Sequence, residues 1–290
     1  MPAEPSLLAD LATLTKVRIS AASSFTAAAG YIAFARTARV DLVFLLLGTV
    51  LLAMGSSALN EVQERAHDAR MPRTAHRPLP RGAFTPGAAT TLALAFAAAG
   101  FGTLVLSHGL PTALLGLLAF GWYNGLYTPL KRVSAFAVVP GSLIGSLPPA
   151  MGWVAAGGSL ADPGFLALGF VLFIWQVPHF WLLQALHAKG YGQGGFPTLR
   201  DHFRPDQVHR LIFTWMAATA SATALLILFR TVSSPAAWIT AGLAALWLLV
   251  RGVRFLRAPV DAPGLYRRTF MDINIYALAL IVATCLDPWL

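Results

Sequence analysis

The chain has 290 residues, of which 57% are hydrophobic and only 11% are charged. A soluble domain carries about 25% charged residues, so this composition excludes an ordinary soluble fold and indicates a membrane protein. The net charge of +9 raises nucleic acid as a partner, but the basic residues lie in short loops between long apolar runs, which argues against one.

About nine apolar runs follow one another along the chain. A membrane-spanning helix needs about 20 mostly apolar residues, and in lipid such a run becomes a helix because every backbone polar group must be satisfied internally. The expected helices are 19–35, 41–59, 87–107, 111–128, 135–156, 164–186, 209–229, 235–250 and 271–287. The sequence therefore predicts an all-α, polytopic membrane protein with one transmembrane domain over residues 1–290.

The distribution of Lys and Arg predicts the orientation of these helices. If the N-terminus is cytoplasmic, only Arg36, Arg39 and Arg230 of the 21 basic residues lie outside, and the other 18 lie inside. Positive residues collect in cytoplasmic loops. We therefore expect an integral protein of the bacterial inner (plasma) membrane with a cytoplasmic N-terminus and a periplasmic C-terminus. Two inside segments, 60–86 and 187–208, are long and polar and are expected to form cytoplasmic caps.

The first polar segment begins on the second expected helix, which should end at Met71 because Pro72 follows. Asn60, Glu64 and Asp68 are spaced i, i+4 and i+8, so they line one helix face. Mg²⁺ takes one or two carboxylates and completes its shell with water and phosphate oxygens, which this face would supply or bind. The alternative is a solvated helix end whose charges pair with one another. Because ionisable groups near a bilayer are costly unless paired or functional, we favour the metal site.

Basic residues follow at two places on the same side. Arg73 and Arg77 come directly after the acidic face, and Arg side chains can bind phosphate oxygens with two parallel hydrogen bonds. Tyr127, Lys131 and Arg132 end the fourth expected helix, where the two basic residues could hold a diphosphate leaving group. The alternative for this second cluster is ordinary positive-inside anchoring beside an interfacial tyrosine.

A third cluster lies within and after the sixth expected helix. His179 is inside the apolar run, and His187, Lys189 and Tyr191 follow it. Polar side chains within a membrane are rare and commonly functional. A single histidine can equally well form a hydrogen bond to a neighbouring helix, so the spacing alone leaves both interpretations open.

Together these clusters resemble the UbiA superfamily of intramembrane prenyltransferases, and within it the protohaem IX farnesyltransferase (haem O synthase) family. That family's signature Asn-x₃-Glu-x₃-Asp-x₂-Met-x-Arg-Thr-x₂-Arg-Pro-Leu is present without a gap from Asn60 to Leu79. Its other motifs match Leu14–Lys16, Tyr127–Arg132, Pro148–Trp153 and Trp175–Trp181. The resemblance therefore spans nearly the whole chain.

The resemblance implies nine helices around a central cavity with polar caps on the cytoplasmic side. It implies farnesyl diphosphate and haem B as substrates, haem O and diphosphate as products, and haem A synthase or a terminal oxidase assembly as partners. Mg²⁺ would be held by Asn60, Glu64 and Asp68, with Lys131 completing the catalytic set. The expected substrate-binding residues are Arg73, Arg77, Tyr127, Arg132, His179, His187, Lys189 and Tyr191, of which His179 would contact haem through its iron or a propionate.

The chain departs from the family at two positions. Val17 replaces a usual proline, and Gly190 stands where the family usually places an aspartate, so the second acidic cluster of the superfamily is depleted. Asp201 and Asp206 lie further along the chain. One alternative is a UbiA-type enzyme that prenylates an aromatic quinone precursor, against which Glu64 and the run around His179 argue. The other is a non-catalytic transporter or scaffold of the same fold, which Gly190 keeps open.

Overall fold

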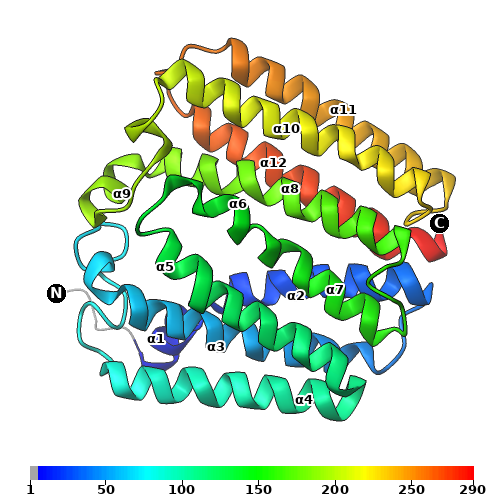
Figure 1. Cartoon of the computed structure of the whole chain (residues 1–290), viewed down its shortest axis with the longest axis horizontal. Coiled ribbons are helices and arrows are strands. Elements are labelled where there is room, and N and C mark those ends of the chain that lie inside the picture. Colours follow the sequence, from blue (N-terminus) through cyan, green and yellow to red (C-terminus); the bar gives the residue numbers. More distant parts are fainter. Residues whose placement is uncertain (1–5) are drawn as a thin grey trace.

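The computed structural model describes residues 6–290, and over this range the chain is helical without β-strands (Figure 1). The long helices are α2 (Val17–Ala35), α3 (Leu42–Asp68), α4 (Pro86–Gly121), α7 (Leu143–Ala155), α8 (Pro163–Leu186), α10 (Pro205–Leu228), α11 (Pro235–Arg257) and α12 (Leu265–Leu286). The short elements are α1 (Leu7–Leu14), a π-helix (Trp122–Tyr127), α5 (Thr128–Leu130), α6 (Val138–Gly141), α9 (Ala188–Gly194) and 3-10 turns at Ala135–Ala137, Leu199–Asp201 and Asp287–Trp289. The predicted all-α membrane fold is confirmed.

Within residues 6–290, seven helical segments are long and apolar enough to cross a membrane, whereas the sequence predicts about nine. Two features explain the difference. The expected helices 87–107 and 111–128 both form, but the sharp turn at Gly109, with φ of 81°, joins them so tightly that they count as one segment, Pro86–Leu130 (Figure 1). The 19-residue helix α2 is not among the seven, since Arg18 and several serines lower its hydropathy.

Local sequence explains where several helices begin. Helices α4, α8, α10 and α11 each have proline in the first turn, where no backbone N–H donor is needed. The hydroxyls of Thr85 and Ser234 accept hydrogen bonds from the N–H groups of Ala88 and Ala237, which caps α4 and α11.

The helices pack as two halves, each with its own apolar core. One core is built on α2, α3, α4 and α7, and the larger one on α8, α10, α11 and α12. Helices α2 and α7 approach very closely, because a Cβ atom at Gly152 would lie 1.9 Å from the carbonyl oxygen of Ala27. Only glycine allows this distance, as is common where membrane helices touch.

The two ends of the helix bundle differ in character. The segment between α3 and α4 lies with α9 at one end, and the C-terminus lies at the other (Figure 1). At the C-terminal end, the Arg36 guanidinium donates hydrogen bonds to the carboxylate of Asp287 and to the hydroxyl of Ser233. The α2–α3 connection, the α10–α11 connection and the C-terminus therefore share one end, as the alternation of the predicted helices requires.

Candidate active site

The acidic face of α3 is buried at the end of the bundle opposite the C-terminus. Asn60, Glu64 and Asp68 are 1%, 5% and 1% exposed, so this is no solvated helix end. Helix α3 ends at Asp68, three residues before the predicted end at Met71. The hydroxyl of Thr74 donates a 2.9 Å hydrogen bond to the Asp68 carbonyl, which replaces the next helical bond and ends the helix there.

Each of the two carboxylates forms an ion pair. The Lys131 ammonium lies 2.8 Å from the Glu64 carboxylate, and the Arg77 guanidinium lies 2.7 Å from the Asp68 carboxylate. Lys131 also lies 5.3 Å from the centre of the Tyr127 ring, within range of a cation–π contact. The sequence-based alternative of mutually paired charges thus describes the contacts correctly, but these pairs are buried rather than solvated. Removing one partner of a buried pair leaves an uncompensated charge, which is strongly destabilising.

A π-helical turn holds Lys131 in place. Over Trp122–Tyr127 the backbone widens at the end of α4, a local distortion that is frequent at functional sites. There the Asn124 carbonyl accepts a 3.1 Å hydrogen bond from the Gln63 side chain, and Arg132 donates a 2.7 Å bond to the Gln63 carbonyl. These contacts fix the end of α5 against α3, so Arg132 serves this junction while Lys131 enters the buried cluster.

Lys16 belongs to the cluster, although sequence reasoning used it only as part of a motif. It has a left-handed backbone with φ of 47°, and its ammonium donates a 3.0 Å hydrogen bond to the Asn60 side chain, whose amide donates to Thr128. Burial, with the positive charges of Arg77 and Lys131, lowers the pKa of Lys16 from 10.5 to about 8. The match of Leu14–Lys16 to the family motif was the available signal for this residue.

Glu61 is the second residue that sequence reasoning missed. Its side chain is completely buried, and it accepts a 3.3 Å hydrogen bond from the backbone N–H of Leu79 while its other oxygen has no hydrogen-bond partner. Glu61 lies three residues before Glu64, so the i, i+3 spacing could have placed it on the same helix face. The contact with Leu79 holds the segment after α3 over the cluster.

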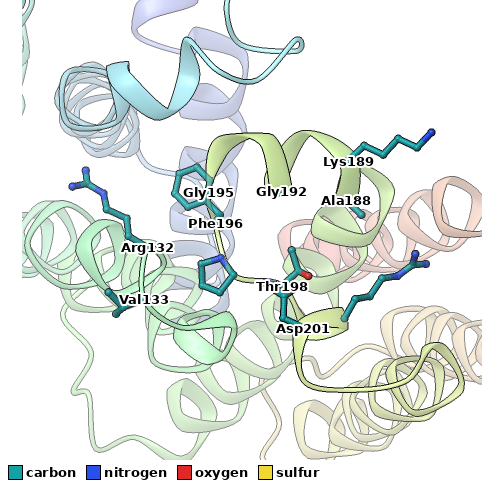
Figure 2. Close-up of a pocket in the computed structure, with 11 residues that line it drawn as sticks. Arg132, Val133, Ala188, Lys189, Gly192, Gly195, Phe196, Thr198 and Asp201 are labelled. Carbon is teal, nitrogen blue, oxygen red and sulfur yellow. Dashed lines mark hydrogen bonds between the residues drawn. The ribbon is translucent and has the colours of Figure 1, made fainter.

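The second polar segment, 187–208, contains the short helix α9 and a 3-10 turn. His187 begins α9, and burial together with the charge of Arg73 lowers its pKa. The pKa of the Tyr191 phenol is raised mainly by burial, while the nearby charges of Arg73 and Glu64 act on it in opposite directions. Lys189 is exposed, and its side chain points outward from α9 (Figure 2). The structure therefore brings His187, Tyr191 and Arg73 to the edge of the acidic site and leaves Lys189 outside it.

The missing carboxylate of this segment is not replaced from elsewhere nearby. A Cβ atom at Gly190 would meet no atom within 4 Å, so the position is open. Asp201 accepts a 2.6 Å hydrogen bond from the backbone N–H of Thr198 and so caps its own 3-10 turn. Asp206 is exposed and forms ion pairs with two neighbouring arginines. Neither aspartate contributes a carboxylate to the cluster on α3.

His179 lies inside the bundle on α8, apart from the charged cluster. Its ring lies 4.9 Å from the rings of both Trp175 and Phe270, and its Nδ1 is buried without a hydrogen-bond partner. The centre of the Phe180 ring lies 5.4 Å from that of His179 and 5.7 Å from that of Tyr127. Aromatic rings in contact therefore fill the space between His179 and the site of Lys131. Asn274 on the neighbouring helix α12 lies within hydrogen-bonding reach of the His179 ring, so the alternative of a hydrogen bond to another helix stays open beside the free Nδ1.

The carboxylates of this cluster fit a metal ion whose remaining ligands come from a bound anion and water. Among residues 6–290 no three His, Cys, Asp or Glu side chains are grouped to hold an ion by themselves. Glu64 and Asp68, one helical turn apart on a buried face, offer the one or two carboxylates that Mg²⁺ commonly takes when phosphate and water complete its shell. The arrangement can bind a metal diphosphate between carboxylates and the cations Lys131, Arg77 and Lys16.

Comparison with known proteins shows the family of the chain. The model of the UbiA prenyltransferase family matches residues 23–274. Protoheme IX farnesyltransferase of Geobacter sulfurreducens is 38% identical over 277 residues, covering 93% of this chain and 97% of the relative. The enzyme of the same name from Oleidesulfovibrio alaskensis is 34% identical over 284 residues, covering 97% of each.

Solved structures share the fold at low sequence identity. A UbiA homologue from Aeropyrum pernix superposes with a TM-score of 0.74 at 18% identity, covering 92% of this chain and 98% of the other. A UbiA homologue from Archaeoglobus fulgidus, bound to GPP and Mg²⁺, superposes with a TM-score of 0.70 at 15% identity, covering 97% of this chain and 100% of the other. The chain belongs to the UbiA prenyltransferase family.

Proposed function

We propose that this protein is a protohaem IX farnesyltransferase, which transfers the farnesyl group of farnesyl diphosphate to a vinyl group of haem B and forms haem O and diphosphate. The observation that carries the proposal is the buried cluster of Glu64, Asp68, Lys131 and Arg77, found in a chain 38% identical over 277 residues to a protoheme IX farnesyltransferase. The cluster has the charges that a diphosphate leaving group needs.

The cluster would act on the allylic C–O bond. Lys131 and Arg77, which neutralise the two carboxylates in the structure, would turn to the phosphate oxygens, joined by Arg73 at the edge of the site. Preorganised positive charge of this kind is usually the largest contribution to catalysis. Glu64 and Asp68 would hold Mg²⁺, and Asn60 would join them once Lys16 no longer donates its hydrogen bond to the Asn60 side chain. The metal would add positive charge beside the departing diphosphate.

The acceptor would approach from the C-terminal half. The allylic cation needs a water-poor surrounding until it is captured, and the aromatic side chains of Tyr127, Phe180 and Trp175 supply one. His179, whose Nδ1 has no partner, would contact haem B through its iron or a propionate. The vinyl group would attack the allylic cation and form a new C–C bond, which leaves a cation on the carbon next to the porphyrin ring. Water would then add to this carbon and lose a proton to solvent, which gives the hydroxyethylfarnesyl substituent. Arg132, His187, Lys189 and Tyr191 would complete the binding of the two substrates.

The direct test is mass spectrometry of haems extracted from membranes with and without this protein expressed. Haem O should appear only with the wild-type protein. Prenylated quinone precursors without haem O would identify the aromatic-ring enzyme instead. The non-catalytic alternative, which rests on the open position at Gly190, predicts no prenylated product of either kind.

We also propose that the caps 60–86 and 187–208 are cytoplasmic and the C-terminus periplasmic, in a bacterial inner membrane, with haem A synthase or a terminal oxidase assembly receiving the product. The separation of the acidic site from the C-terminus along the bundle supports the opposite placement of the two ends (Figure 1). A periplasmic reporter enzyme fused after Leu290 should be active, and a cytoplasmic reporter at the same position should not. The reverse pattern would reject this orientation.

A further inference from the structure

An open cleft of about 680 Å³ lies beside the acidic cluster and is not explained by the binding of a metal diphosphate. Arg132 and Val133, which follow α5, form one side (Figure 2). Helix α9 and the segment from Gly195 to Asp201 form the other side. The cleft thus lies between the end of the N-terminal half and the second polar segment of the C-terminal half.

The cleft has a surplus of positive charge. Arg132, Lys189 and Arg200 border it, and none of the three forms an ion pair with a carboxylate among the described residues. The Nε of Arg132 is buried without a hydrogen-bond partner. Arg200 makes a long 3.4 Å bond to the Tyr266 hydroxyl, and its guanidinium lies 5.7 Å from the centre of that ring. The single carboxylate of the cleft, Asp201, is engaged as a helix cap. The cleft therefore suits an anion that brings no metal.

The floor of the cleft is apolar and adjoins the catalytic cluster. Phe196 is 6% exposed and lies with its ring 5.8 Å from the Lys131 ammonium and 4.8 Å from the His67 ring. Val133 and Pro197 also line the cleft. A ligand on this surface would be separated from the diphosphate cluster by a single aromatic ring, so an apolar body with acidic substituents would fit.

We propose that this cleft binds the carboxylate edge of the acceptor porphyrin through Arg200, with Arg132, and so positions the acceptor beside the farnesyl donor. The inference rests on the proposed function. A diphosphate is the weaker candidate because its metal needs carboxylate ligands, and those of Glu64 and Asp68 lie on α3 and not in the cleft, where Asp201 is engaged as a cap. Arginine binds carboxylates with directional, charge-assisted hydrogen bonds, which gives Arg200 a specific role.

The test measures binding of zinc protoporphyrin IX and of its dimethyl ester, whose carboxylates are masked, to the full-length protein in nanodiscs. Arg200→Gln should weaken binding of the diacid about fivefold, as expected for one partly exposed ion pair, and leave the ester unchanged. Arg257→Gln is the matched control, because Arg257 is exposed at the end of α11 and does not line the cleft. It should change neither affinity, and farnesyl diphosphate binding should be the same in all three proteins.

Three outcomes would overturn the inference. Equal loss in Arg200→Gln and Arg257→Gln would show a general effect of surface charge. Equal loss for diacid and ester in Arg200→Gln would show that the carboxylates are not recognised. Weaker farnesyl diphosphate binding in Arg200→Gln would assign the cleft to the donor. These are binding measurements, so they remain informative even if no haem O is formed. In that case the proposed reaction would be rejected, while the binding of the porphyrin in the cleft would still be supported.

Discussion

The two polar segments at the same end of the bundle differ in the groups that they place near the site. The first, residues 60–86 with the end of α3, contributes buried carboxylates that each hold a cation. The second, residues 187–208, contributes histidine, tyrosine and an open glycine, and its two aspartates are engaged in a cap and in surface ion pairs. Similar positions in the two halves therefore do not imply similar roles. In the proposed reaction the first segment would bind the diphosphate, and the second would bind the acceptor.

The largest effect should follow from removing a carboxylate of the first segment. Glu64→Gln and Asp68→Asn should each lower Mg²⁺-dependent farnesyl transfer by about a hundredfold or more, because charge stabilisation at the leaving group is lost. Product formation at saturating Mg²⁺ measures this effect in protein of confirmed expression and folding.

Asp206→Asn is the control from the second segment. Its carboxylate is exposed and forms only surface ion pairs, so turnover should stay near the wild-type value. If Glu64→Gln or Asp68→Asn retained normal turnover, that residue would not be a metal ligand, and the contrast between the segments would fail.

An intermediate effect should follow from His179→Ala. If the free Nδ1 of His179 contacts haem B, kcat/KM for haem should fall about tenfold, the value of one strong hydrogen bond or ligand contact, while the KM for farnesyl diphosphate stays unchanged. Steady-state kinetics with each substrate varied in turn measures both constants. A rise in the farnesyl diphosphate KM alone would place His179 on the donor side instead.

The smallest effect should follow from Gly190→Asp, which adds the carboxylate usual in the family. The new side chain meets no atom at its Cβ, so folding should be unaffected. We expect the Mg²⁺ concentration for half-maximal activity to change by about two- to fivefold, with the same product, since a partly exposed charge has a limited effect. An inactive wild type that the substitution revives would mean that the second acidic cluster is essential and the native chain is not a working synthase.

The sequence predicts the helices and the acidic face of α3 well because both depend on local spacing. Apolar runs locate the spans, and the i, i+4, i+8 pattern places Asn60, Glu64 and Asp68 on one buried face. Contacts between distant segments could not be predicted in this way. The end of α3 depends on a bond from the side chain of Thr74, and the approach of Lys16 to the cluster depends on a left-handed residue between α1 and α2.

The second polar segment was harder to predict for a related reason. Its glycine-rich sequence has weak helix preference, yet α9 forms over Ala188–Gly194, where packing and the hydrogen bond between His67 and the Gly194 carbonyl, 2.7 Å long, hold it. The junction at Gly109, by contrast, was predicted as a gap between two helices. The folded chain agrees, because the backbone leaves helical geometry at Gly109 and the chain turns back there (Figure 1).

The buried Asp287 has a mechanical consequence. Its carboxylate accepts hydrogen bonds from the backbone N–H groups of Ser233 and Ser234 and from Arg36, and so ties the end of α2 to the α10–α11 connection and the C-terminus. A buried carboxylate that loses its partners is strongly destabilising. We therefore expect the two halves to move least relative to each other at this end. An opening that admits the charged groups of the substrates would then occur at the opposite end of the bundle.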